Sequence, residues 1–205
     1  MYWIKTPSWV QALFPRRTWR IPTLEKVLYL TFDDGPTPGV TETVLDHLRA
    51  FGAKATFFCI GERVRANPAL FQALQDAGHA IGNHTHTHPN GWHSSTKRFL
   101  ADVERSESFI ASNLFRPPYG KLLPAQARHL ASRYRIIMWD VMSGDFDATL
   151  SSGQVYQNVI DHAEVGSIIV LHDNEKAAPR MLEALPQLLD YYTSRGFYFE
   201  QLPPV

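Results

Sequence analysis

The chain has 205 residues, of which 44% are hydrophobic and 20% are charged, a composition typical of one soluble globular domain with a substantial core. Basic and acidic residues each number 20, so the formal net charge is zero, which argues against a nucleic-acid-binding surface. No apolar run is long enough to span a membrane. The single cysteine, Cys59, excludes an intramolecular disulfide, and its apolar neighbours predict a buried side chain.

Residues 1–26 are predicted to form an N-terminal extension that packs on a main domain spanning residues 27–205. The extension carries Trp3, Trp9 and Trp19, which we expect to cap the core rather than to bind a ligand. It lacks the uninterrupted apolar segment and the small-residue cleavage site of a signal peptide. As written, the sequence predicts a cytoplasmic protein, or a cell-envelope protein if a leader has been removed.

Strands and helices alternate along the main domain. An apolar run ending at Asp33 predicts the first strand, and further strands are predicted at 54–60, 80–85, 114–119, 134–141, 167–173 and 197–202. Helices are predicted at 37–50, 62–77, 96–113, 124–133, 154–163 and 179–194. About seven strand–helix units in so short a chain favour an α/β fold, a compact barrel of parallel strands in a single domain. A doubly wound open sheet is the alternative.

Two adjacent carboxylates, Asp33 and Asp34, follow the first strand. Neighbouring strand residues point to opposite faces, so both carboxylates can face one site only if the chain leaves extended geometry between them. Gly35 permits such a turn. The pair suits a division of labour in which one carboxylate holds a cation and the other moves a proton. The plainer alternative is a turn with solvated acids.

Other strands also end in polar residues: His84, His86 and His88 follow the third, Arg116 the fourth, Asp140 and Asp145 the fifth, and His172 the sixth. The carboxyl ends of parallel strands meet at one mouth, so these side chains are expected to form a site. Imidazoles with one carboxylate are a familiar ligand set for catalytic zinc. Spacing alone does not choose the ligands, because a helix would place His84 and His88 on one face and a strand all three.

Two further roles follow from residue chemistry. A guanidinium beside a carboxylate base would hold the base ionised and oriented, which is the role that we assign to Arg116. An imidazole can donate a proton near neutral pH, so His172 is the candidate general acid. The other histidines lie on predicted helices or loops and are interpreted as structural or solvated.

Four motifs in this order resemble those of NodB-type polysaccharide deacetylases, the family-four carbohydrate esterases: Thr31-Phe32-Asp33-Asp34-Gly35, His84-Thr85-His86-Thr87-His88, Arg116-Pro117-Pro118-Tyr119-Gly120 and Leu171-His172-Asp173. The resemblance covers roughly residues 27–202. It implies a distorted (β/α)7 barrel. It also implies that Zn²⁺, or another divalent cation such as Co²⁺, is bound by Asp34, His84 and His88, with His86 as a non-ligand.

The resemblance also implies catalytic roles. Asp33 would be the general base, oriented by Arg116, and the backbone N–H of Tyr119 would help the metal to hold the oxyanion. His172 would be the general acid, paired with Asp145, which would raise its pKa.

The remaining motif departs from the family pattern. Many members have an Asp where this chain has Met142 and a Trp where it has Phe146. Phe146 can still line an acetyl-methyl pocket with apolar residues such as Val170. These changes bear on substrate preference more than on the chemistry.

The resemblance predicts a bacterial hydrolase that acts on linear amides and removes acetyl groups from N-acetylglucosamine-containing glycans, either chitin-type oligomers or peptidoglycan. Action as an acetyl esterase on O-acetylated xylan, or on a small non-sugar amide, is the alternative within hydrolysis. A catalytically silent glycan-binding protein is the alternative outside it. The predicted partner is the acetylated glycan, and the sequence makes no prediction of the oligomeric state.

Overall fold

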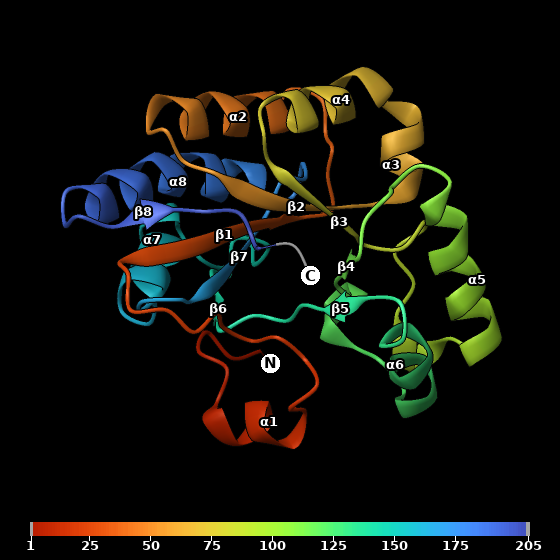
Figure 1. Cartoon of the computed structure of the whole chain (residues 1–205). Coiled ribbons are helices and arrows are strands. Elements are labelled where there is room, and N and C mark those ends of the chain that lie inside the picture. The colour runs from red at the N-terminus through yellow and green to blue at the C-terminus, as the bar shows by residue number, and fades with distance from the viewer. Residues whose placement is uncertain (1, 204–205) are drawn as a thin grey trace.

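The computed structural model describes residues 2–203 and shows one sheet of parallel strands wrapped by helices (Figure 1). The strands are β1 Val27–Asp33, β2 Ala55–Cys59, β3 Ala80–Asn83, β4 Leu114–Phe115, β5 Arg135–Ile136, β6 Val141–Met142, β7 Ile168–His172 and β8 Tyr198–Phe199. The strands formed by the longest apolar runs, β1, β2 and β7, are buried along almost their whole length, as expected where both faces of a sheet are covered.

The strand order confirms the predicted distorted barrel. Neighbours run β5-β4-β3-β2-β1-β7-β6, with β8 added beside the start of β1, and all the pairs are parallel. This is the sequential order of a seven-stranded barrel whose ladder is open between β5 and β6. In a doubly wound sheet, the order of the strands would instead reverse beside the first strand, while the strands stay parallel.

Helices cover the outside of the curled sheet (Figure 1). Within residues 2–203, none of them is long and apolar enough to cross a membrane. The α-helices are α1 Ser8–Leu13, α2 Thr41–Ala50, α3 Gly61–Ala66, α4 Pro68–Asp76, α5 Thr96–Glu107, α6 Pro124–Leu130, α7 Ser152–Ile160 and α8 Ala178–Thr193, with 3₁₀ turns η1 Gly91–His93 and η2 Pro118–Gly120.

The N-terminal segment, residues 2–20, lies beside the open part of the barrel. It forms isolated bridges from Lys5 to Val141, from Thr18 to Ile137 and from Arg20 to Ser167. These bridges occupy strand edges that would otherwise present unpaired backbone groups.

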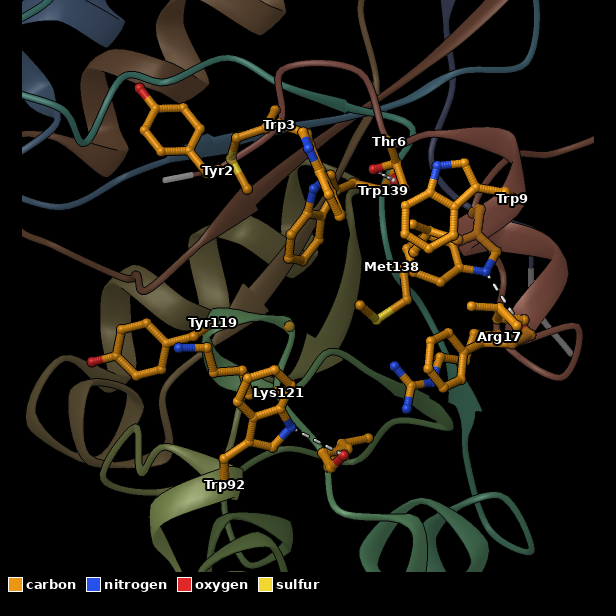
Figure 2. Close-up of a pocket in the computed structure, with 17 residues that line it drawn as sticks. Tyr2, Trp3, Thr6, Trp9, Arg17, Trp92, Tyr119, Lys121, Met138 and Trp139 are labelled. Atoms are coloured by element: carbon orange, nitrogen blue, oxygen red, sulfur yellow. Dashed lines mark hydrogen bonds between the residues drawn. The ribbon is translucent and has the colours of Figure 1, made fainter.

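A buried charge anchors the same segment. The fully buried Asp140 carboxylate pairs with Lys5 Nζ at 2.8 Å and lies 3.7 Å from Arg20 Nε. Asp140 therefore holds the extension and does not join the strand-end site expected from the sequence. Trp19 caps the core as predicted and is 8% exposed, whereas the prediction was wrong for Trp3 and Trp9, which are 51% and 60% exposed and line a pocket (Figure 2).

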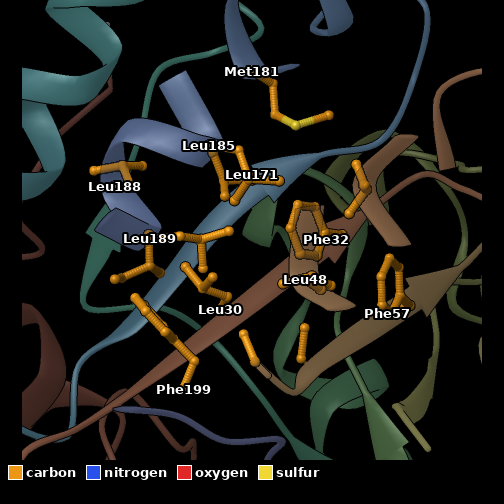
Figure 3. Close-up of a cluster of buried hydrophobic side chains, with 14 of the residues drawn as sticks. Leu30, Phe32, Leu48, Phe57, Leu171, Met181, Leu185, Leu188, Leu189 and Phe199 are labelled. Carbon is orange, nitrogen blue, oxygen red and sulfur yellow. The ribbon is translucent and has the colours of Figure 1, made fainter. Parts of the chain in front are cut away.

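Alternation along β1 separates the core from the site. Leu28, Leu30 and Phe32 face outward into a cluster formed with α2 and α8, and Phe32 stacks on Phe57 with ring centroids 5.0 Å apart (Figure 3). Residues of opposite parity, ending in Asp33, point to the inner face of the barrel. Burial of the outer row thus fixes where the Asp33 carboxylate points.

Several predicted elements differ in length from those observed. The predicted strand 134–141 is two short strands, because its middle bonds to the N-terminal segment, as in the hydrogen bond from Met138 N to Thr18 O. The predicted helix 62–77 divides at Asn67, since Pro68 begins a new helix and cannot continue the old one. Helix α1 was not predicted.

Candidate active site

The two carboxylates at the end of β1 reach one site through a left-handed residue. Asp34 itself has a φ of 82°, so its side chain turns to the same side of the chain as that of Asp33. The sequence-based explanation, which assigned this turn to Gly35, was wrong. Gly35 is needed for another reason: a Cβ there would overlap the Asp173 carboxylate, which accepts a hydrogen bond from Gly35 N at 3.0 Å.

Three of the predicted ligands come together. Asp34 Oδ1 lies 3.6 Å from His84 Nε2 and 3.2 Å from His88 Nε2, and one ligand atom from each residue falls within 4.8 Å of the others. Asp34 Oδ1 is buried and has no hydrogen-bond partner. A buried oxygen with no partner, aimed at two imidazole nitrogens, is a donor set that fits a divalent cation such as zinc.

The electrostatics suit deprotonated ligands. Burial lowers the pKa of His84 to about 4, and its Nδ1 donates to the carbonyl oxygen of Arg116 at 2.7 Å, which leaves Nε2 as the free lone pair. Burial opposes the ionisation of Asp34, but the nearby imidazoles of His88, His172 and His84 outweigh it and lower the pKa of this carboxyl. A neutral imidazole beside an ionised carboxylate is the state that binds metal.

The loop after β3 decides which histidines meet. Thr85 and His88 both have left-handed backbones, with φ of 68° and 58°, so residues 84–88 follow neither a strand nor a helix. The rings of His84 and His88 lie 5.0 Å apart, while His86 turns away and stacks on Phe109. Non-glycine residues held in a left-handed backbone conformation are strained, and such residues cluster at functional sites.

Asp102 on α5 holds this loop, a contact that sequence reasoning missed. Its Oδ1 accepts hydrogen bonds from the backbone N–H groups of His86 and Thr87 at 2.7 and 2.9 Å, and its Oδ2 accepts one from Thr87 Oγ1. The carboxylate therefore satisfies two backbone N–H groups of the loop that leads to His88. No sequence motif marked Asp102, because its partners are backbone N–H groups that lie at least 15 residues earlier in the chain.

Arg116 lies fully buried against the Asp33 carboxylate. Its Nη1 donates to Asp33 Oδ1 at 2.6 Å and to Thr31 Oγ1 at 2.8 Å, and its Nη2 donates to the Met138 carbonyl. The guanidinium carbon also sits 4.2 Å from the ring centre of Phe58. Asp33 Oδ2 is left on the side of the candidate metal ligands, 4.0 Å from His84 Nε2.

A second pair lies at the end of β7, where His172 is the register partner of Asp33 on β1. His172 Nδ1 donates to Asp145 Oδ1 at 2.7 Å, and the His172 backbone N–H donates to Asp145 Oδ2. Burial would lower the pKa of His172, but the charge and hydrogen bond of Asp145, with Asp34 and Asp33 beyond, raise it to about 9. With Nδ1 engaged, the Nε2–H of a protonated imidazole remains as a donor to the site.

The other predicted residues surround these two pairs. Phe146 meets the His172 ring edge-on at 5.3 Å, and Val170 is fully buried on the same face of β7 as His172. The Tyr119 ring meets that of His88 at 4.7 Å, and Tyr119 has a left-handed backbone with φ of 58°. The ten residues that were assigned a catalytic, metal-binding or substrate-binding role thus lie around one mouth, whereas His86 and Asp140, the other polar residues expected there, do not join them.

Sequence reasoning missed Asn174, and it named Asp173 only as part of a motif, without a role. Asn174 Nδ2 donates to Asp34 Oδ2 at 2.7 Å, which orients the carboxylate so that Oδ1 faces the histidines. The Asp173 carboxylate accepts a hydrogen bond from Thr41 Oγ1 at 2.6 Å as well as the one from Gly35 N. Burial raises the pKa of Asp173 to about 7. The sequence signal that could have found Asn174 is its position directly after the motif Leu171-His172-Asp173.

Replacing Gly35 by Ala is expected to destabilise the fold by about 1–3 kcal/mol, because the new methyl group overlaps the Asp173 carboxylate. Gly153→Ala is the matched control, since a Cβ on Gly153 meets only Ser151 Oγ at 3.8 Å and alanine favours the helix. Urea unfolding measures both. Equal stability of the Gly35→Ala and wild-type proteins would contradict the packing described here.

Comparison with known proteins shows what the whole chain is similar to. The family model described as polysaccharide deacetylase matches residues 20–138. A peptidoglycan-N-acetylglucosamine deacetylase of Bacillus cereus is 34% identical over 189 residues, covering 89% of each chain. A chitooligosaccharide deacetylase of Azorhizobium caulinodans is 32% identical and covers 90% of this chain and 96% of its own. The crystal structure of a peptidoglycan N-acetylglucosamine deacetylase superposes with a TM-score of 0.85 at 29% identity, covering 97% and 95% of the two chains.

Proposed function

The chain belongs to the polysaccharide deacetylase family, the family-four carbohydrate esterases, and from this premise we propose that it hydrolyses the N-acetyl groups of N-acetylglucosamine-containing glycans, either chitin-type oligomers or peptidoglycan. Asp34, His84 and His88 would hold Zn²⁺ or a similar divalent cation. The observation that carries the proposal is that Asp34, His84 and His88 lie beside the Asp33 carboxylate, while His172, hydrogen-bonded to Asp145, ends the neighbouring strand as the register partner of Asp33. The bacterial relatives support a bacterial origin.

The bound cation would polarise the acetyl carbonyl and lower the pKa of a water molecule beside it. Asp33, oriented by Arg116, accepts a proton through Oδ2 as the water attacks the carbonyl carbon. The backbone N–H of Tyr119 donates to the developing oxyanion, a contribution of about 3–4 kcal/mol for a well-placed donor. His172 then donates its Nε2 proton to the departing nitrogen, and acetate and a free amine result.

Acetate release from N-acetylglucosamine oligomers tests the proposal. Protein reconstituted with Zn²⁺ should release acetate and generate one primary amine for each acetate, and treatment with a chelator should abolish both. Acetate release from O-acetylated xylan alone would identify an acetyl esterase, and release from a small amide alone would identify a non-sugar amidohydrolase. Failure of the reconstituted protein on all three substrates would favour a silent glycan-binding protein and refute the proposal.

The pH profile has an expected shape on the basic side. The acid must be protonated to act, so kcat should fall as pH rises through the pKa of His172, about 9. Asp145→Asn removes the neighbouring charge that raises this pKa, so its basic limb should move to lower pH. Profiles of kcat at saturating oligomer measure the shift, and identical basic limbs in the two proteins would contradict the assignment of His172.

A further inference from the structure

An apolar pocket of about 440 Å³ lies between the N-terminal segment and the barrel. Figure 2 shows Trp3 and Trp9 on one side, Trp92 and Tyr119 on the opposite side, and Met138 and Trp139 between them. Seven of the nine large hydrophobic side chains that are exposed in residues 2–203 line this pocket. Exposed aromatic groups gathered in one place mark a binding surface rather than chance exposure.

The pocket adjoins the candidate active site. Tyr119, which lines the pocket, also packs its ring against that of His88, a candidate metal ligand. Met142 at the end of β6 lines the pocket as well, and its backbone pairs with Val170 beside the site. An extended substrate held at the metal set would therefore enter this pocket with its neighbouring units.

The lining favours a sugar chain over a lipid tail. Trp3, Trp9 and Trp92 are between 51% and 60% exposed, so their rings are open to the solvent rather than enclosed in a dry channel. An aromatic ring can cover the apolar C–H face of a pyranose while the hydroxyl groups stay hydrated. Two cationic side chains, Arg17 and Lys121, also line the pocket. Their N–H groups can donate hydrogen bonds to the hydroxyl and acetamido oxygens of a sugar.

Contacts hold several of these aromatic rings in place. Trp92 Nε1 donates to the Leu122 carbonyl oxygen, and Lys121 Nζ lies 5.1 Å from the Trp92 ring centre. Trp3 and Trp9 meet edge to face with centroids 5.9 Å apart. Rings fixed in this way lose little conformational freedom when a ligand binds.

We propose that the pocket formed by Trp3, Trp9, Trp92 and Tyr119 binds the sugar units that flank the unit being deacetylated, so that the N-terminal segment selects glycan chains over short acetylated sugars. This inference rests on the proposed function for the identity of the sugar. It assigns a role to residues 2–17, which precede the part of the chain that the family model matches.

Chain-length dependence tests the proposal. The ratio of kcat/KM for five-unit to that for two-unit N-acetylglucosamine oligomers should exceed one in the wild type and fall about tenfold in Trp9→Ala and in Trp92→Ala, the loss typical of one well-packed aromatic contact. Trp9→Phe keeps an aromatic face and should recover much of the ratio. Leu24→Ala, which removes an exposed apolar side chain outside the pocket, is the control and should leave the ratio unchanged.

Binding measured without turnover separates this proposal from the proposed function. Calorimetric titration of the five-unit oligomer into the Asp33→Asn protein should show about tenfold weaker binding when Trp9→Ala is added. If this weakening is seen while no wild-type preparation releases acetate, the sugar-binding pocket stands and the proposed function fails.

Two results would overturn the sugar-binding proposal. In the first, both tryptophan variants keep the wild-type ratio and affinity. In the second, phosphatidylglycerol–phosphatidylcholine vesicles sediment the wild type but not Trp9→Ala, while oligomer affinity is unchanged, which would assign the surface to a membrane.

Discussion

Asp33→Asn is expected to lower kcat for acetate release by about 10²–10⁴-fold, the range for losing a positioned proton acceptor. Asparagine keeps the shape of the side chain and can still accept the Arg116 hydrogen bond that Asp33 Oδ1 accepts at 2.6 Å. It cannot take a proton from water. The loss should therefore appear in kcat with little change in KM, measured by acetate release from N-acetylglucosamine oligomers.

Two controls make this result specific. Zinc content of Asp33→Asn should equal that of the wild type, because the candidate ligands are Asp34, His84 and His88. Asp190→Asn, the same change at an exposed position of α8, should retain full activity. Retention of more than a tenth of the wild-type kcat by Asp33→Asn would place the base elsewhere.

Arg116→Met is expected to reduce the free energy of unfolding by about 3–5 kcal/mol, a large part of the stability of an ordinary domain. Methionine fills part of the space, but the Asp33 carboxylate, buried beside the guanidinium, would lose its compensating charge. The Met138 carbonyl would also lose a hydrogen bond. Urea or guanidinium unfolding measures the change.

The double variant Arg116→Met/Asp33→Asn identifies the cause. Removing the charge of Asp33 should recover part of the lost stability, because the uncompensated carboxylate is then absent. If Arg116→Met costs the same in both backgrounds, the loss comes from packing and from the other hydrogen bonds. That result would contradict the charge pairing as the reason for burying Arg116.

The fold could be predicted from the sequence because its signals are local. Apolar runs such as 55–59 and 168–172 are long enough to mark buried strands, and helices alternate with them. The weak strands could not be bounded, since β4, β5 and β6 are two residues long and depend on pairing with distant segments. Helix α1 has no buried residue, so it has no periodic apolar signal to detect.

The candidate site was predictable in its chemistry but not in its geometry. Titratable residues at strand ends could be placed at one mouth, because parallel strands end together. The left-handed backbones of Asp34 and Thr85 could not be anticipated, since nothing in their residue type requires them. Asp102 and Asn174 were missed for a related reason: their roles depend on partners brought close only by folding.

The most direct test of the account is the number of zinc ions bound per chain in the wild type and in His88→Gln after exhaustive dialysis, with acetate release measured on the same samples. His47→Gln is the matched control, because His47 is a half-buried histidine on α2, outside the candidate metal-binding set. We expect one ion per chain in the wild type and His47→Gln, and loss of both ion and activity in His88→Gln. A wild type that binds no divalent cation, or a His88→Gln protein that keeps both ion and activity, would contradict it.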